Sequence, residues 1–319
     1  MKEIRKQRQF NVNGYPIASL SSNDGSVGFY NGEGYFYLFD RIGRQLGIQK
    51  LDPVGFSDAE ELEDFVVLTN LSGKSYYSNL NIAKIDILAK VEMPTSWNTK
   101  LFFIQNHKLY SWSFKKDFPT WISKFVNVEK IYPCGDLLLV MTTHHWFVMK
   151  QNGDFELLTD QVLPFTSASY LPRNNTFHFT LPAGELGLIN LNDRLTEPFV
   201  TQGSGSGIKI LGTSGRDKIA ISCYNQLLFM IATSERFDAY SSLVVNNLHQ
   251  FPLKAFQHQE SPHFLIQEDL WNVSVWTPEA DDCIWRAVFD SEVCYLKFNQ
   301  SNFHVGLKSG DIHSFSFSL

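Results

Sequence analysis

The chain has no long apolar run, few cysteines and no excess of basic charge. None of its apolar runs approaches the roughly 18 residues that a membrane-crossing helix needs. Its first residues, MKEIRKQRQ, are charged where a secretory signal would be apolar. The four cysteines (Cys134, Cys223, Cys283 and Cys294) are too few and too scattered for a disulfide framework. A net charge of -6 offers a polyanion no bulk attraction. These absences predict an intracellular protein, cytoplasmic or nuclear, with no membrane partner.

The short motifs of common enzyme chemistry are also missing. The sequence has no Gly-x-Ser-x-Gly, no phosphate-binding P-loop and no Gly-x-Gly-x-x-Gly that opens a helix. The adjacent His144 and His145 are the most metal-like residues. Neighbouring side chains on a strand point to opposite faces, so we expect solvated or partner-facing loop histidines there and no metal. We therefore predict a protein that is not an enzyme and holds no cofactor.

What the chain has in abundance is short strand-like runs. Phe, Tyr and Trp make up 14% of the residues, which favours strands. Residues 17–51 read as IASLSS, SVGFYN, YFYLFD and RQLGIQKL, separated by Gly-containing turns that are typical of hairpins. Similar units recur about every 40 residues, the length of one four-stranded propeller blade. The pattern predicts an all-β fold, with residues 1–319 forming a single β-propeller domain.

The count of these units favours eight blades. Seven remains the alternative, because residues 82–93 (IAKIDILAKVEM) could form one strand shared by two units, or a short helix. The last unit has only three strands, VCYLKF, FHVGLK and IHSFSFS, whereas residues 4–12 (IRKQRQFNV) form a lone strand-like run. Pairing the first strand with the last three would close a ring and protect its edges. We therefore predict a ring closed by the N-terminal strand.

The chain resembles the WD-repeat superfamily and its divergent relatives along nearly its whole length, through architecture rather than motif. Ser309-Gly310-Asp311-Ile312 and the following Phe315 look like the turn and third strand of such a repeat. The Trp-Asp pair that would close that strand is replaced here by Phe-Ser. The resemblance implies a propeller of this superfamily and singles out no particular family.

One segment has the composition of a flexible linker. Residues 203–207 read GSGSG. Two interpretations are open: an engineered replacement of a longer loop, or a natural glycine-rich loop.

Loops on a closed scaffold offer a preformed surface for partners. In a propeller, the loop between the second and third strands of every blade lies on the same face. Trp271 is the first choice on that face, because a large aromatic is unexpected in the polar loop QEDLWNVS and an exposed Trp often anchors an interface. The alternative is that it folds back over its own blade. The candidates are Trp271, Leu270, Asp269, His144, His145, His107 and Glu33.

The strongest charge run is predicted to be a loop on the opposite face. It holds Asp58, Glu60, Glu61, Glu63 and Asp64, which could receive a basic partner or serve only as a solvated loop. The basic N-terminal residues are predicted to lie on the exposed face of an edge-paired strand, where contact with phosphate is the alternative.

These observations favour a non-catalytic protein–protein interaction scaffold, present as a monomer within a hetero-complex. One alternative is an accessory subunit that positions RNA or DNA, which a basic stripe and salt-sensitive binding would favour. Another is a propeller hydrolase, which a ring of carboxylates or an ordered metal would favour.

Overall fold

The computed structural model describes residues 4–22, 24–62, 65–80, 85–88, 91–113, 119–159, 164–171, 175–182, 185–192, 199–200, 209–214, 218–223, 226–232, 237–244, 255–257, 264–277, 282–299 and 302–317. The chain divides into two compact units. The first contains Met1–Tyr132 and Ser291–Leu319, and the second contains Pro133–Asp290. The GSGSG segment, residues 203–207, lies outside the described residues.

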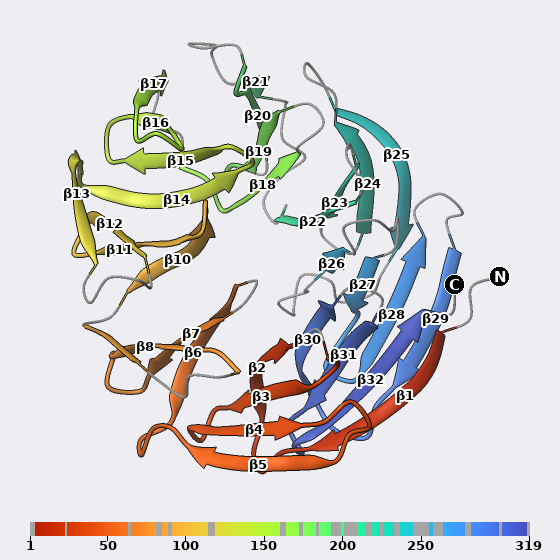
Figure 1. Ribbon diagram of the computed structural model, residues 1–319. Coiled ribbons are helices and arrows are strands. Elements are labelled where there is room, and N and C mark those ends of the chain that lie inside the picture. The colour runs from red at the N-terminus through yellow and green to blue at the C-terminus, as the bar shows by residue number, and fades with distance from the viewer. Residues whose placement is uncertain are drawn as a thin grey trace. The chain divides into compact units, whose positions relative to one another are not determined.

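The first unit contains four antiparallel sheets of four strands each (Figure 1). Sheet 1 consists of β2 (Pro16–Ser21), β3 (Val27–Asn31), β4 (Tyr35–Phe39) and β5 (Gln45–Lys50). Sheet 2 consists of β6 (Phe56–Glu61), β7 (Val66–Asn70), β8 (Ser75–Ser78) and β9 (Ile85–Leu88). Sheet 3 consists of β10 (Glu92–Trp97), β11 (Lys100–Gln105), β12 (Lys108–Trp112) and β13 (Thr120–Val126). Sheet 8 consists of β30 (Val293–Asn299), β31 (Asn302–Leu307), β32 (Asp311–Phe317) and β1 (Ile4–Asn11).

The second unit repeats this plan, and its first strand begins just before the boundary between the units. Sheet 4 consists of β14 (Val128–Cys134), β15 (Leu137–Thr142), β16 (Trp146–Lys150) and β17 (Phe155–Thr159). Sheet 5 consists of β18 (Ser167–Leu171), β19 (Thr176–Thr180), β20 (Leu186–Asn190) and β21 (Phe199–Val200). Sheet 6 consists of β22 (Lys209–Ser214), β23 (Lys218–Cys223), β24 (Gln226–Ala232) and β25 (Phe237–Val244). Sheet 7 consists of β26 (Ala255–Gln257), β27 (Phe264–Gln267), β28 (Asn272–Thr277) and β29 (Asp282–Val288).

The ambiguous segment at residues 82–93 contributes to two different sheets. Ile85–Leu88 is the last strand of sheet 2, and Glu92–Trp97 is the first strand of sheet 3. The expectation of one strand shared by two sheets is therefore wrong. The alternative, a short helix, is also wrong for residues 85–88 and 91–93, which are the part of this segment that the structure describes. In the described ranges every regular element is a strand, and no helix has the length and apolarity needed to cross a membrane.

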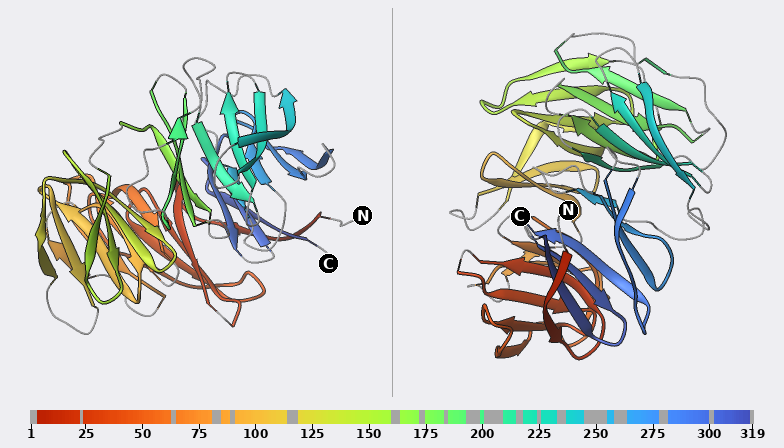
Figure 2. Two further views of the ribbon diagram at one scale, coloured as in Figure 1. Left: turned by 90° about the horizontal axis from the view of Figure 1, so that it is seen from above. Right: turned by 90° about the vertical axis from the view of Figure 1, so that its right-hand side faces the viewer.

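The first strand of the chain completes the last sheet. β1 pairs antiparallel with β32, from Ile4 opposite Phe317 to Asn11 opposite Asp311 (Figure 2). A recurring backbone bond shows that β1 takes the place of a fourth strand. In four sheets an amide one or two residues after the fourth strand donates to the carbonyl of the residue just before the third strand. These bonds join Leu51 to Gly34 (2.8 Å), Val128 to His107 (2.9 Å), Phe289 to Trp271 (2.9 Å) and Val12 to Gly310 (2.9 Å).

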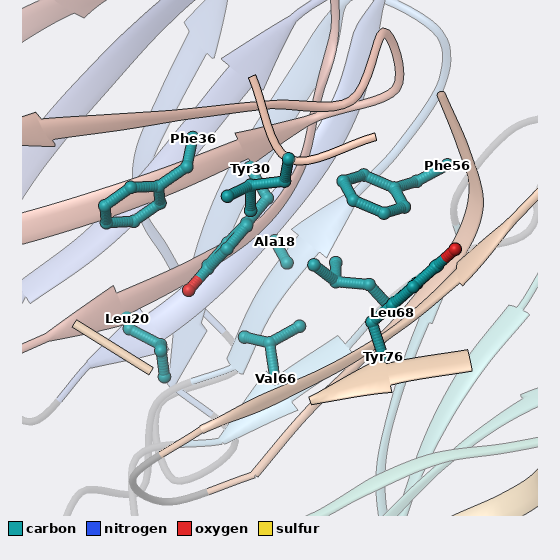
Figure 3. Packing of buried hydrophobic residues seen from close by; sticks show 9 residues of the cluster. Ala18, Leu20, Tyr30, Phe36, Phe56, Val66, Leu68 and Tyr76 are labelled. Atoms are coloured by element: carbon teal, nitrogen blue, oxygen red, sulfur yellow. The ribbon is translucent and has the colours of Figure 1, made fainter. Parts of the chain in front are cut away.

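Apolar side chains pack between neighbouring sheets. Phe10 of β1 packs against Phe29 and Phe39 of sheet 1, with ring centroids 5.2 and 5.0 Å apart. A second cluster joins sheet 1 to sheet 2, and Figure 3 shows Phe36 and Tyr30 of sheet 1 on one side of it and Val66, Leu68 and Tyr76 of sheet 2 on the other. Burying one such side chain contributes about 2 kcal/mol. Sheets 8, 1 and 2 are therefore stabilised in large part by packing against one another.

Candidate partner-binding surface

Polar side chains hold the turn between the second and third strands of several sheets, here called the second turn. The Asn31 side-chain oxygen accepts a bond from the Tyr35 amide at 2.8 Å. Asn70 does the same for the amides of Ser72 and Lys74, at 3.0 and 2.9 Å. These short polar residues mimic a backbone turn, which is why they mark turns in the sequence. The loops that could meet a partner are therefore ordered by their own residues.

In sheets 1 and 2, four loops are joined edge to edge into what we call the loop platform, residues 12–15, 31–34, 51–55 and 70–73. The amide of Gly32 donates to the Tyr15 carbonyl at 3.0 Å. The amide of Phe56 donates to the Gly32 carbonyl at 2.9 Å, and that of Leu71 to the Gly55 carbonyl at 3.1 Å. Backbone bonds thus run across the platform from one loop to the next.

A buried carboxylate fixes the centre of the loop platform. Asp52 is only 1% exposed. Its Oδ1 accepts bonds from the amides of Val54 and Gly55, at 2.8 and 3.2 Å, and its Oδ2 accepts one from Asn70 Nδ2 at 3.1 Å. Gly34 lies against the same loop with φ +86°, and a Cβ there would stand 2.3 Å from the Asp52 carbonyl oxygen. This close approach requires glycine.

Three apolar side chains project from this ordered backbone. Tyr15, Val54 and Leu71 are 44%, 52% and 65% exposed. The Tyr15 ring lies against Gly32, where an added Cβ would come within 2.1 Å of it. Glu33 is exposed in the same platform, and Lys50 Nζ donates to its carbonyl at 2.6 Å. Isolated exposed apolar residues need no explanation, but several on one bonded platform make it a candidate interaction surface.

Of these four platform residues, the sequence prediction includes Glu33 and misses Tyr15, Val54 and Leu71. Each missed residue lies inside a turn motif: NGYP, DPVG or NLSGK. A large apolar residue within a polar turn is the same signal that selects Trp271, so it could have found all three.

The other predicted residues lie elsewhere. His107 is in the second turn of sheet 3, and its carbonyl accepts the Val128 amide at 2.9 Å. Sheet 2 stands between this turn and sheet 1, because its Phe65, Val67 and Tyr77 pack against sheet 3. Within the first unit, the structure therefore does not bring His107 together with Glu33.

The remaining five candidates belong to the second unit. His144 and His145 are exposed in the second turn of sheet 4, with ring centroids 6.4 Å apart. In sheet 7, Asp269 Oδ1 accepts the Trp271 amide at 2.7 Å, and Leu270 is partly exposed. The Trp271 side chain is 47% exposed. This exposure favours a surface aromatic over one that folds back on its own sheet, whereas the role of these five residues stays a prediction.

The first part of the acidic run is a strand rather than a loop, which corrects the sequence prediction for the residues that the structure describes. Phe56–Glu61 is strand β6, so Asp58, Glu60 and Glu61 belong to a strand, whereas Glu63 and Asp64 lie outside the described residues. The sequence FSDAEE has only two apolar residues, three positions apart, so it lacks the alternation that marks a strand. Glu61 Oε2 lies 3.0 Å from Lys297 Nζ, and Glu61 Oε1 accepts the amide of Ser19. Glu61 is therefore engaged within the protein.

The residues around Glu61 form a cluster that joins three sheets, here called the Glu61 cluster. Tyr295 Oη lies 2.6 Å from Glu61 Oε1 and 2.7 Å from Ser19 Oγ. A hydroxyl carries one proton, so Tyr295 donates to the carboxylate and Ser19 donates to Tyr295. Lys297 Nζ also donates to the Ser19 carbonyl at 2.9 Å. Burial and the Glu61 carboxylate hold the pKa of Tyr295 well above its ordinary value.

Solved structures share this fold at very low sequence identity. A computationally designed protein, Ika8, has a TM-score of 0.72 at 10% identity, over 96% of this chain and 97% of that one. BamB from Moraxella catarrhalis has a TM-score of 0.68 at 9% identity, over 99% and 100% of the two chains. Sqt1 from Saccharomyces cerevisiae has a TM-score of 0.64 at 11% identity, over 97% and 98%.

These likenesses bear on the fold alone and support a β-propeller. In sequence, no family model matches the chain, and no curated protein matches it either.

Proposed function

We propose that this protein is a non-catalytic interaction scaffold, a WD-like propeller whose eight sheets form a ring that β1 closes. It works inside the cell, as a monomer within a hetero-complex, by offering ordered loops to partner proteins. The observation that carries this proposal is the loop platform, where Tyr15, Val54 and Leu71 stand exposed on a backbone held by Asp52.

The platform has the two properties that favour binding. Its apolar side chains gain free energy when a partner removes them from water, together about 2–3 kcal/mol for the area now exposed. Its backbone is already ordered, so a partner does not have to immobilise these loops. A rigid apolar centre within a polar rim is the arrangement in which a few side chains dominate binding.

The test compares partners of two double variants purified from the protein's own cells. Val54→Asp/Leu71→Asp places charge on the platform without touching the core. Val126→Asp/Leu157→Asp is the matched control, because both residues are exposed apolar residues on strands of sheets 3 and 4, away from the platform. We expect stable partners to be lost only from the platform variant. The same partners in both preparations would contradict the proposal, and a Trp271→Ala copy tests the second unit in parallel.

A further inference from the structure

Asparagine is a chemically labile residue, and it is most labile when glycine follows it. The backbone nitrogen of the glycine attacks the side-chain amide carbon of the asparagine, and glycine hinders this approach least because it has no side chain. The sequence contains three such pairs: Asn13-Gly14, Asn31-Gly32 and Asn152-Gly153. The structure gives the three pairs different surroundings, and these surroundings decide which pair is free to react.

Asn31-Gly32 is held at both of its reacting groups. The Asn31 side chain is buried, its Oδ1 accepts the Tyr35 amide at 2.8 Å, and its Nδ2 donates to the Asn13 carbonyl. The attacking nitrogen is occupied as well, because the Gly32 amide donates to the Tyr15 carbonyl at 3.0 Å. All of these bonds must open before the asparagine side chain and the glycine nitrogen can meet.

Asn152-Gly153 lies in the turn between β16 and β17, where Asn152 is exposed. Its Nδ2 donates to Asp154 Oδ2 at 2.7 Å, and its Oδ1 accepts the Asp154 amide at 3.0 Å. The Gly153 amide donates to the Lys150 carbonyl at 2.9 Å. Solvent reaches this pair, but hydrogen bonds tie both of its reacting groups to the turn.

Asn13-Gly14 lies between β1 and β2 in the loop platform, and Asn13 is exposed. Within the described residues, neither the Asn13 side chain nor the Gly14 amide takes part in a hydrogen bond. The peptide group that joins the two residues is nevertheless positioned, because the Asn13 carbonyl accepts a bond from Asn31 Nδ2. That carbonyl oxygen shares the negative charge when the Gly14 nitrogen loses its proton, so the bond from Asn31 stabilises the attacking form.

We propose that Asn13 is a modification site, at which the folded protein converts spontaneously to aspartate and isoaspartate. The Gly14 nitrogen forms a bond to Asn13 Cγ, and the bond from Cγ to the side-chain nitrogen breaks. The proton of the Gly14 amide passes through solvent to that leaving nitrogen, so ammonia departs and a succinimide ring remains. Water then opens the ring at either carbonyl, which yields aspartate or isoaspartate.

The modification changes the loop platform in two ways. Both products add a carboxylate next to Gly14, where the Glu33 carboxylate already lies, since a Cβ on Gly14 would stand 2.9 Å from Glu33 Oε1. These like charges repel each other. Isoaspartate also inserts a methylene group into the main chain between β1 and β2. The chemistry at Asn13 does not depend on the proposed function, whereas an effect of these changes on a partner does.

The test compares the folded protein with the same protein unfolded in urea, both kept at mildly alkaline pH. Mass spectrometry of proteolytic peptides measures conversion at each of the three pairs, and chromatography separates aspartate from isoaspartate. The variant Asp154→Ala removes the acceptor of Asn152 Nδ2 and leaves the platform unchanged. Circular dichroism checks that this variant is folded.

We expect Asn13 to convert at least about tenfold faster than the other two asparagines in the folded protein, because their hydrogen bonds must open first. In urea all three should convert at similar rates, since each is followed by glycine. Asp154→Ala should speed conversion at Asn152 alone. Equal rates at Asn13 and Asn152 in the folded protein would overturn the proposal, and so would an Asn13 that reacts only when the chain is unfolded.

Discussion

The Glu61 cluster makes a quantitative prediction about stability. Glu61 and Lys297 side chains are 20% and 21% exposed, with Oε2 and Nζ 3.0 Å apart. Lys297→Met leaves the carboxylate largely buried without its counter-ion, and Glu61→Gln leaves the ammonium in the same state. Breaking a fully buried pair costs about 3–5 kcal/mol. Because a fifth of each side chain meets water, we expect each single change to lower the free energy of unfolding by about 2–3 kcal/mol.

The double variant Glu61→Gln/Lys297→Met removes both charges together. It should cost about as much as either single change, which corresponds to a coupling energy of about 2 kcal/mol. Urea unfolding of all four proteins, followed by tryptophan fluorescence, completes the cycle. The matched control is Lys308 with Glu292 in the same unit, whose atoms are closer, at 2.6 Å, but whose side chains are 55% and 32% exposed.

The control pair should show a coupling of about 0.5 kcal/mol, typical of exposed pairs. Burial, rather than distance, is therefore expected to decide the coupling. A coupling for the Glu61 pair no larger than that of the control would refute this reasoning, and it would mean that water screens the cluster as it does the surface.

Three further predictions concern the loop platform and a buried histidine. Asp52→Ala should lower the free energy of unfolding by about 3 kcal/mol and speed amide exchange in the platform, because three donors lose their acceptor; Asp52→Asn, which keeps one acceptor oxygen, should cost less. Gly34→Ala should cost about 3 kcal/mol in chemical unfolding through its positive φ and backbone clash, whereas Gly47→Ala, with no atom within 4 Å of the new Cβ, should change stability little. Burial, helped by nearby positive charge, lowers the pKa of His304 to about 4. Between pH 6.5 and pH 4 the unfolded chain binds a proton at this histidine that the folded chain does not bind. His304 alone should therefore lower the free energy of unfolding by about 3 kcal/mol as the pH drops from 6.5 to 4. Thermal unfolding of His304→Leu should show a smaller pH dependence, and an unchanged one would contradict this assignment.

Much of the local structure could be predicted from the sequence. The strands of sheet 1 and sheet 8 were located within a residue or two, because their alternation and their Asn- or Gly-containing turns act over short distances. The pairing of β1 with β32 was also predictable, since each end of the chain lacked a partner. Boundaries failed at residues 82–93, where the apolar spacing fitted more than one element.

The candidate surface was predicted less well. Glu33 was found because it stands in a recognisable hairpin loop, but its neighbours on the platform come from three other loops. The structural role of Asp52 could not be predicted. The sequence of a turn with one carboxylate is the same whether that carboxylate faces solvent or accepts a hydrogen bond from Asn70. Trp271 is exposed, as one of the two interpretations expected, whereas its role in binding stays a prediction.

The sequence by itself determined most of the strands, their order and the turns that join them, since these follow from residues close together in the chain. Only the tertiary structure decided which charges face inward. Glu61 belongs to an acidic run that looks solvated, and its partner Lys297 is more than 200 residues away along the chain. Such a contact depends on how separate sheets meet, and no local pattern of residues encodes the side chains that will stand opposite one another.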